Sequence, residues 1–173
     1  WIALTFSAKA ERLLIETDTH CKVWWAGSTY KIMQNDPVPE KKGKVVIRSA
    51  KNETESFQLI LSPVADIEDI TVTNSDFSTT DGSFIPSENI TIRNVEYVHV
   101  TKPTGKLHKA GWYPDPLPLY EKPFGVVAGE NSPLWFTVKV PKDAAPGKYT
   151  ANISLKSASW EVKVPVELHI WNF

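Results

Sequence analysis

The sequence is poor in the residues on which disulfide-linked, metal-binding and membrane-spanning proteins depend. It has one cysteine in 173 residues, so neither an internal disulfide nor a cysteine-based metal site is possible. No run approaches the roughly 18 consecutive apolar residues of a membrane span. The 19 basic and 20 acidic residues nearly balance, without a basic run or face. That balance argues against a nucleic acid partner.

Catalytic and cofactor-binding motifs are also missing. The sequence has no Gly-x-Ser-x-Gly elbow, no glycine-rich phosphate loop and no His-Glu-x-x-His motif. Its histidines form no i,i+2 or i,i+4 pair that could seed a metal site. Carboxylate pairs such as Glu53 and Glu55 share a strand face, but such spacing is too common to indicate a glycosidase site. We therefore predict no catalytic residue, no metal ion and no cofactor in this chain.

Two smaller features, a cysteine and a group of oxygen donors, can each be interpreted either as structural or as functional. Cys21 lies next to an aromatic strand and is expected to be a small buried residue rather than a nucleophile. Asn74, Asp76 and Asp81 supply oxygen donors within one turn-rich segment. Their spacing fits no known calcium loop, so Asx turns are the favoured reading and a bound calcium ion the alternative.

Alternation of apolar and polar residues dominates the C-terminal part of the chain. From Trp160 to Ile170 every second residue is apolar, and the pattern also runs through Tyr149–Leu155 and Leu134–Val140. Side chains of a strand alternate between its two faces, so each segment predicts a strand with one buried face. The connections between them are short. We predict a three-stranded antiparallel meander whose apolar face needs a second sheet to cover it.

Further short strands are expected in the earlier part of the chain, at 10–17, 22–32, 44–49, 55–61, 67–73 and 90–100. The apolar phase changes within the last of these, which predicts a bulge near Asn94 or partial cover on both faces. No window shows helical periodicity. About nine or ten strands with turns between them predict an all-β fold, an antiparallel two-sheet β-sandwich of immunoglobulin-like or jelly-roll type. We expect residues 1–173 to form one such domain.

A long segment, 101–131, lacks both the strand and the helix period. It carries five prolines and several aromatic residues, among them Trp112, Tyr113 and Tyr120. Its high aromatic content argues against disorder, so we predict an ordered loop in which 111–120 forms a flap fixed by its aromatics. The flap is either a surface for a sugar or a neighbouring domain, or a plain cover over one end of the sandwich. The residues alone favour the cover.

Several blocks together resemble a known family. They are Ala50–Gln58, Asn94–Val98, Gly111–Leu117, Ala128–Trp135 and Val140–Tyr149. The Asn-Glu-Thr-Glu-Ser-Phe-Gln stretch within the first and the Trp-Tyr-Pro-Asp-Pro-Leu stretch within the third are similar to the N-terminal domain of bacterial glycoside hydrolase family 123-like proteins. Many members of that family are domains of unknown function. The resemblance covers most of the chain from about Ala50 onward.

The resemblance implies a specific arrangement. Family members place a β-sandwich before a (β/α)₈ barrel that carries the acidic catalytic pair and removes N-acetylgalactosamine from glycoconjugates. We therefore expect a non-catalytic accessory domain of a secreted or otherwise extracytoplasmic bacterial glycoside hydrolase. Its partner is the C-terminal catalytic barrel of the same polypeptide. The sequence stops at Phe173, where the family runs into that barrel, so no catalytic residue can be assigned here.

Five residues are candidates for contact with a glycan or with the barrel: Trp112, Tyr113, Asp115, Trp135 and Trp171. Trp171 and Phe173 are expected to be partly exposed. Two alternatives stay open. An independent carbohydrate-binding module would present loop aromatics as an exposed platform. An immunoglobulin-like structural or adhesive domain would have neither a concave site nor an exposed aromatic cluster.

Overall fold

A computed structural model describes residues 12–104 and 109–172. These residues form fourteen strands and one short 3₁₀ helix, η1 (Ser87–Asn89). The strands are β1 (Arg12–Thr17), β2 (Cys21–Gly27), β3 (Val45–Ser49), β4 (Thr54–Pro63), β5 (Ile67–Asn74), β6 (Phe77–Ser78), β7 (Phe84–Ile85), β8 (Ile90–Asn94), β9 (Tyr97–Val100), β10 (Gly111–Pro114), β11 (Phe124–Val126), β12 (Ser132–Lys139), β13 (Gly147–Lys156) and β14 (Glu161–Ile170). The all-β class is confirmed, with more strands than the nine or ten expected.

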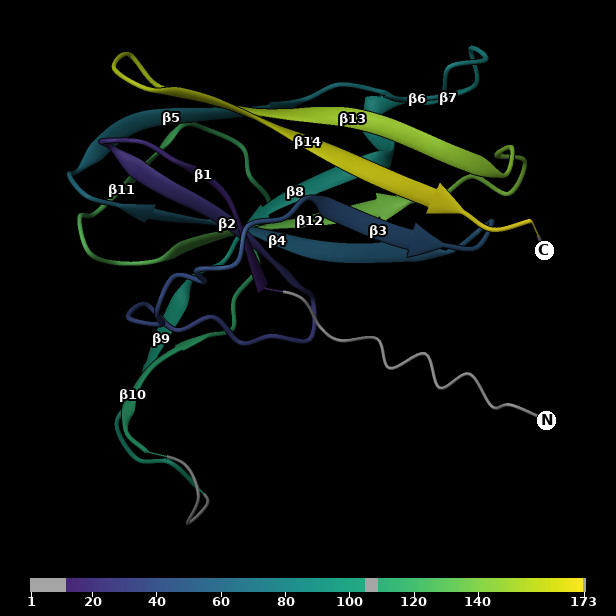
Figure 1. Ribbon diagram of the computed structural model, residues 1–173. Coiled ribbons are helices and arrows are strands. Elements are labelled where there is room, and N and C mark those ends of the chain that lie inside the picture. The colour runs from purple at the N-terminus through teal and green to yellow at the C-terminus, as the bar shows by residue number, and fades with distance from the viewer. Residues whose placement is uncertain (1–11, 105–108, 173) are drawn as a thin grey trace.

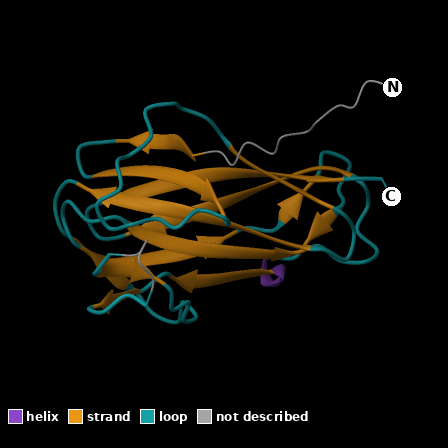
Figure 2. Ribbon diagram, turned by 90° about the horizontal axis from the view of Figure 1, so that it is seen from below, coloured by secondary structure: helices purple, strands orange, loops and turns teal. Residues whose placement is uncertain are grey.

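Two main sheets form a sandwich (Figures 1 and 2). The five-stranded sheet has the order β1-β2-β4-β12-β8. The seven-stranded sheet has the order β11-β5-β13-β14-β3, with β6 paired to β13 and β7 paired to β6. A separate two-stranded hairpin, β9–β10, projects away from the sandwich (Figure 1). Pairing between the named strands is antiparallel except for β3 and β14, which run parallel.

The main core lies between the two sheets and follows from the alternation in the sequence. Leu59 and Phe136 of the five-stranded sheet and Ile153 and Val164 of the seven-stranded sheet are all buried there. Phe57 stacks on Phe136 with ring centroids 5.2 Å apart. Burying one such side chain contributes about 1.5–3 kcal/mol. Packing across the two sheets therefore supplies most of the stability of the fold.

The predicted C-terminal meander is only partly correct. β13 and β14 do form a continuous antiparallel hairpin, from Gly147 opposite Ile170 to Lys156 opposite Glu161. β12, however, pairs with β4 and β8 in the other sheet, so the segment after it carries the chain across the sandwich. An alternating apolar face fits either sheet equally well. The sequence pattern therefore gives the strand but not its neighbours.

The phase change near Asn94 marks the end of a strand rather than a bulge inside one. β8 ends at Asn94 and β9 begins at Tyr97 in a different sheet. The loop expected at 101–131 also contains two short strands, β10 and β11. Between them, 115–120 runs along the outer edge of β8, where Tyr120 N–H donates to Ile92 O at 3.0 Å. Tyr120 packs on the core and its hydroxyl accepts a hydrogen bond from Val72 N–H at 2.9 Å, so an aromatic does fix this part of the flap.

A second, smaller core lies on the outer face of the five-stranded sheet. Trp24 and Ile60 point outward from β2 and β4, and Ile32 from the covering loop 28–43 packs on them. Asn131 holds that loop down, because its Nδ2 donates to Met33 O at 3.0 Å and to Asp36 O at 2.9 Å. One face of the sandwich is thus covered by an irregular loop. Because the loop has no sequence periodicity, its position could not be predicted from the sequence.

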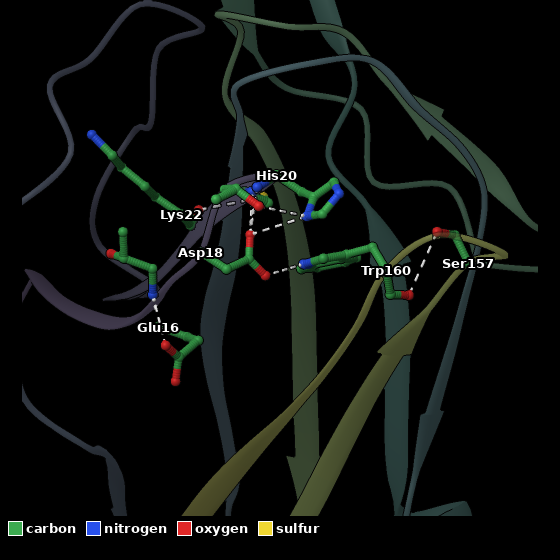
Figure 3. Close-up of polar contacts among 9 residues, drawn as sticks. Glu16, Asp18, His20, Lys22, Ser157 and Trp160 are labelled. Atoms are coloured by element: carbon green, nitrogen blue, oxygen red, sulfur yellow. Dashed lines mark hydrogen bonds and ion pairs between the residues drawn. The ribbon is translucent and has the colours of Figure 1, made fainter.

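One end of the sandwich is closed by a polar link between the two sheets (Figure 3). Asp18, in the β1–β2 turn, accepts hydrogen bonds from Trp160 Nε1 at 2.7 Å and from the N–H groups of His20 and Cys21 at 2.7 and 2.8 Å. Burial raises the pKa of Asp18, but these hydrogen bonds outweigh it, so the pKa lies below its usual value. Trp160 itself is buried just before β14. Asp18 therefore ties together turns that belong to opposite sheets.

Candidate functional site

The β9–β10 hairpin brings three of the five candidate residues together. Directly opposite pairs are Trp112 with His99, and Tyr113 with Val98. Opposite residues of an antiparallel pair share a face, and successive residues alternate. Trp112 and Tyr113 therefore point to opposite sides of the hairpin. Asp115 follows the end of β10, and its N–H donates to Glu96 O at 3.1 Å.

The first face of the hairpin presents an aromatic pair to solvent. Trp112 is 51% exposed, and its ring stacks on the imidazole of His99 with centroids 4.8 Å apart and an interplanar angle of 27°. Trp112 is thus not packed beneath its own loop. An exposed tryptophan held flat by a neighbouring ring is suited to contact with an apolar partner surface.

The second face forms one wall of a groove with a volume of about 320 Å³. Val98, Val100 and Tyr113 supply apolar surface, and the Tyr113 hydroxyl donates to Lys109 O at 2.8 Å. Charged lining residues come from three segments: Lys31 from the covering loop, Lys102 and Lys109 from the hairpin connection, and Asp115 from the residues that follow β10. Sequence analysis missed the lysines, because residues so far apart in the chain carry no shared pattern.

The base of the hairpin is anchored to the sandwich. The Tyr97 hydroxyl donates to Ile32 O at 2.8 Å, which connects β9 to the covering loop. Burial raises the pKa of Tyr97, and the negative charges of Asp36 and Glu130 raise it further. The phenol is therefore neutral and acts as a fixed donor. This contact holds the first face of the hairpin against the loop that also supplies Lys31 to the groove.

The remaining two candidates lie elsewhere. Trp135 is half-buried on the outer face of the five-stranded sheet, opposite Gln58 and Arg93, and its Nε1 donates to Thr137 Oγ1 at 3.1 Å. Trp171 directly follows β14 and is 42% exposed, as expected. Phe173 lies outside the described residues. The five candidates therefore form one cluster of three residues and two separate positions rather than a single site.

A second hollow, of about 270 Å³, lies beside the covering loop and is lined by Lys22, Asp36, Ser62 and Asn131 among others. Ser62 and Asn131, two of its polar groups, are occupied by hydrogen bonds of the fold. Trp24 Nε1 donates to Ser62 Oγ at 2.8 Å, and Ser62 Oγ donates in turn to Asn131 Oδ1 at 2.5 Å. This chain of bonds continues through Asn131 to the covering loop. We therefore regard the hollow as part of the fold.

Three carboxylates noted in the sequence, Glu53, Asp76 and Asp81, accept hydrogen bonds within the fold. Glu53 Oε2 accepts one from Ala50 N–H at 2.6 Å, whereas burial and the charge of Glu53 raise the pKa of Glu55. Asp76 accepts from Ser87 N–H, and Asp81 accepts from Thr79 and Ser83. The Asp81 bond to Ser83 N–H has the spacing of an Asx turn, as anticipated, whereas Asp76 bonds to a residue eleven positions away and Asn74 Nδ2 donates to Ser87 O. Among residues 12–104 and 109–172, no three His, Cys, Asp or Glu side chains gather as metal ligands.

Cys21 is fully buried at the start of β2. Burial raises the pKa of its thiol to about 12, and the nearby charge of Asp18 adds to the increase. The thiol is therefore protonated at neutral pH. Because the thiolate is the reactive form of cysteine, the protonated thiol is a poor nucleophile. The interpretation of Cys21 as a small packing residue is confirmed.

Comparison with known families decides the identity of the domain. Residues 25–157 match the glycoside hydrolase 123 N-terminal domain. The chain belongs to this family. The match covers the covering loop, the β9–β10 hairpin and strands β3 to β13, and it leaves out β1, most of β2 and β14. The predicted family resemblance is thereby confirmed, and it extends further toward the N-terminus than the sequence blocks indicated. A comparison with curated protein sequences gives no match.

Solved structures support the fold of this family 123 domain. A family 123 glycoside hydrolase from Clostridium perfringens, described in a study of glycolipid glycan hydrolysis, superposes with a TM-score of 0.77 at 14% identity. The superposition covers 88% of this chain and 28% of that protein. The sporulation control protein Spo0M of Bacillus subtilis gives a TM-score of 0.42 at 11% identity. The superposition covers 90% of this chain and 51% of the Spo0M chain. The latter likeness is too low to carry an argument.

Among the residues that the structure describes, no helix is long and apolar enough to cross a membrane.

Proposed function

We propose that this family 123 domain is a non-catalytic accessory domain of a bacterial glycoside hydrolase, and that it packs against a catalytic barrel which follows it in the same polypeptide. The parent enzyme is proposed to act on N-acetylgalactosamine glycosides. The observation that carries the proposal is the Trp112–His99 face. It is an exposed aromatic pair on a hairpin that projects from the sandwich (Figure 1). Such a surface is suited to burial against another domain.

The physical weakness of a two-stranded hairpin supports a contact role. An isolated hairpin is marginally stable in water, and three or more strands or a packed partner are needed for independent stability. Tyr97 anchors the base, but Val98, His99 and Trp112 stay exposed beyond it. A neighbouring domain that covers Trp112 would bury apolar surface and complete this small sheet. Trp171 is exposed at the end of the last strand, on the side of the sandwich away from the hairpin (Figure 1), so it is a separate candidate contact.

The carboxylates that line the two hollows of the described residues support a non-catalytic role. Glycoside hydrolysis needs two carboxyl groups across a cleft, about 5–5.5 Å or 6.5–9.5 Å apart. Within the described part of the chain, each of the two hollows is lined by a single carboxylate, Asp36 in one and Asp115 in the other. The catalytic pair is therefore expected in the barrel.

The activity test compares residues 1–173 with a polypeptide that continues into the following domain. Both are assayed on chromogenic N-acetylgalactosaminides and N-acetylglucosaminides. We expect hydrolysis only by the longer polypeptide, and preferentially of the N-acetylgalactosaminide. Hydrolysis by the short chain at a comparable rate would overturn the non-catalytic assignment.

The contact test uses Trp112→Ala in the longer polypeptide, followed by differential scanning calorimetry. Loss of the contact should separate one coupled unfolding transition into two and lower the melting temperature of the barrel. Phe84→Ala is the matched control, because Phe84 is a 63% exposed aromatic on β7, away from the hairpin. Equal effects of the two variants would show that Trp112 has no special role between domains.

A carbohydrate-binding module is the second candidate, and the exposure of Trp112 favours it. Had the ring been packed beneath its own loop, that candidate would have failed. A glycan array probed with residues 1–173 and with Trp112→Ala distinguishes the two functions, because only a module loses glycan signal in the variant. An immunoglobulin-like spacer predicts no concave site and no exposed aromatic cluster. The groove and the Trp112–His99 pair count against it.

An extracytoplasmic location is part of the same proposal and rests on the family. Fractionation of cells that express the complete gene is its test. We expect the protein in the periplasm, at the cell surface or in the medium. Recovery in the cytoplasm alone would contradict it.

A further inference from the structure

We propose that the groove on the second face of the β9–β10 hairpin binds an acidic sugar, a pyranose that carries a carboxylate or a sulfate ester. This groove faces away from Trp112 and is defined by Lys31, Lys102, Lys109, Tyr113 and Asp115, with the valines of β9. It is a binding site in its own right, and it does not depend on contact between Trp112 and a catalytic domain.

The charge of the groove selects an anion. Lys31, Lys102 and Lys109 line it together, and none of the three forms an ion pair with a carboxylate of the described residues. Other lysines of the chain do pair, as Lys148 does with Glu167 at 2.9 Å. Three unpaired ammonium groups beside one carboxylate leave a net positive site. A cleft of one charge sign concentrates ligands of the opposite sign.

The apolar wall selects a ligand with a flat hydrocarbon face. Val98 is 42% exposed, and Val100 and the Tyr113 ring lie on the same side of the hairpin. Small-molecule sites are concave and largely apolar, with a few convergent polar groups, and have volumes of about 300–1,000 Å³. At about 320 Å³ this groove is at the small end of that range. One or two sugar rings, whose C–H faces are apolar, suit its size and its wall.

Asp115 favours a polyhydroxylated anion over an acidic peptide. Asp115 lines the groove together with the lysines, and among the described residues no side chain donates a hydrogen bond to its carboxylate. A carboxylate accepts hydrogen bonds from sugar hydroxyls but repels a cluster of acidic side chains. A peptide that added a strand to the hairpin would also need backbone donors, and Pro103 and Pro114 at the groove have none.

The experiment titrates residues 1–173 by isothermal calorimetry with three probes. These are a galacturonic acid disaccharide, a sulfated galactosamine disaccharide and a neutral galactose disaccharide. We expect at least one acidic probe to bind about tenfold more tightly than the neutral one, a ratio that one good charge-assisted hydrogen bond supplies. Binding of only one acidic probe identifies the carboxylate or the sulfate ester as the ligand group. Affinity should fall between 50 and 500 mM NaCl, because the attraction is screened.

Two variants place the binding in the groove. Lys31→Ala combined with Lys102→Ala should weaken binding of the acidic probe about tenfold or more. Lys163→Ala removes an exposed lysine from β14 and is the matched control, while Trp112→Ala tests the opposite face. Neither should change the affinity. Circular dichroism and melting temperatures verify that all variants are folded.

Four results would overturn the proposal. The first is equal affinity for acidic and neutral probes, or no binding of any probe. The second is unchanged binding in the double lysine variant. The third is tighter binding of a glutamate-rich, tyrosine-containing peptide than of either acidic sugar, which would identify the groove as a protein contact. A loss of binding in Trp112→Ala alone would place the sugar on the other face and would also contradict the proposal.

Discussion

The sandwich and the β9–β10 hairpin use the same residue types in opposite ways. Trp24 on β2 is completely buried, and its indole N–H is bonded to Ser62. Trp112 on β10 is half exposed and touches the ring of His99. Both are tryptophans on strands, although the sequence predicted a strand only around Trp24. The difference shows that one part of the molecule buries aromatic surface for its own stability while the other presents it to solvent.

The contrast between buried Trp24 and exposed Trp112 is tested most directly by truncation of the Trp24 side chain. Trp24→Ala should lower the free energy of unfolding by about 3–5 kcal/mol, because it leaves a cavity and removes the donor to Ser62. Urea denaturation followed by far-UV circular dichroism measures the change. A loss below about 1 kcal/mol would mean that the covering loop collapses into the vacated space at little cost.

Asn131→Ala is expected to have the next largest effect. The substitution removes the donor to Met33 O and Asp36 O and the acceptor of the Ser62 hydroxyl, all at a buried position. Leaving buried polar groups unpaired costs about 1–3 kcal/mol. Hydrogen exchange should show faster opening of 28–43 than in the control Asn35→Ala, where the side chain is exposed. Equal exchange rates in the two variants would contradict the role of Asn131 as the anchor of the loop.

Acid should weaken the sandwich through the link shown in Figure 3. The pKa of Asp18 is lowered from 3.8, so its carboxylate stabilises the fold above about pH 4. That contribution is lost as the pH falls through the lowered folded-state pKa. Glu167, whose pKa its two lysine partners hold at about 2, acts in the same direction. The Asp18 contribution is no more than about 1 kcal/mol, because the carboxylate is partly exposed.

The measurement is the free energy of unfolding at pH 6 and at pH 2.5 for the wild type and for Asp18→Asn. The wild type should be the more stable at pH 6, and the difference between the two proteins should shrink at pH 2.5. A difference that is constant with pH would mean that Asp18 acts through its shape rather than its charge.

The smallest effect on stability is expected for Trp112→Ala in the chain of residues 1–173. The ring is half exposed and lies beyond the anchored base of the hairpin, so the loss should stay below about 1 kcal/mol. The same urea denaturation provides the measurement. A loss as large as that of Trp24→Ala would show that the hairpin is part of the cooperative core, and the contrast between the two regions would disappear.

Sequence alternation predicted the elements of the sandwich better than their arrangement. β4, β5, β13 and β14 were expected close to their actual bounds, because burial of one face repeats every second residue. β12 has the same pattern but pairs with β4 and β8 instead of β13. Alternation records which side of a strand is buried. It carries no information about which sheet the strand joins, and that choice depends on contacts between distant residues.

The candidate site was predictable only in part, for the same reason. Trp112, Tyr113 and Asp115 were identified because aromatic and proline residues cluster in 111–120, and the structure brings those three to one hairpin. The strand β10 itself was missed, since four residues that begin with glycine and end with proline offer no usable period. The groove was missed entirely. The groove depends on Lys31 of the covering loop, which lies next to the hairpin in the structure but far from it in the sequence. No local sequence pattern predicts such a long-range contact.

The parallel pairing of β3 with β14 has a consequence for how the protein is made. Within the described part of the chain, residues 45–49 pair as a strand with residues 166–170, whereas β13 and β14 are neighbours along the chain. During synthesis on the ribosome, β3 emerges early and must wait, unpaired on that side, until nearly the entire sequence has left the exit tunnel. Long-range closure of this kind slows folding and leaves strand edges open to association. Pairing of the last five residues of β14 is thus the final closing step of the nascent domain, after which any polypeptide that follows can begin to fold beside a finished sandwich.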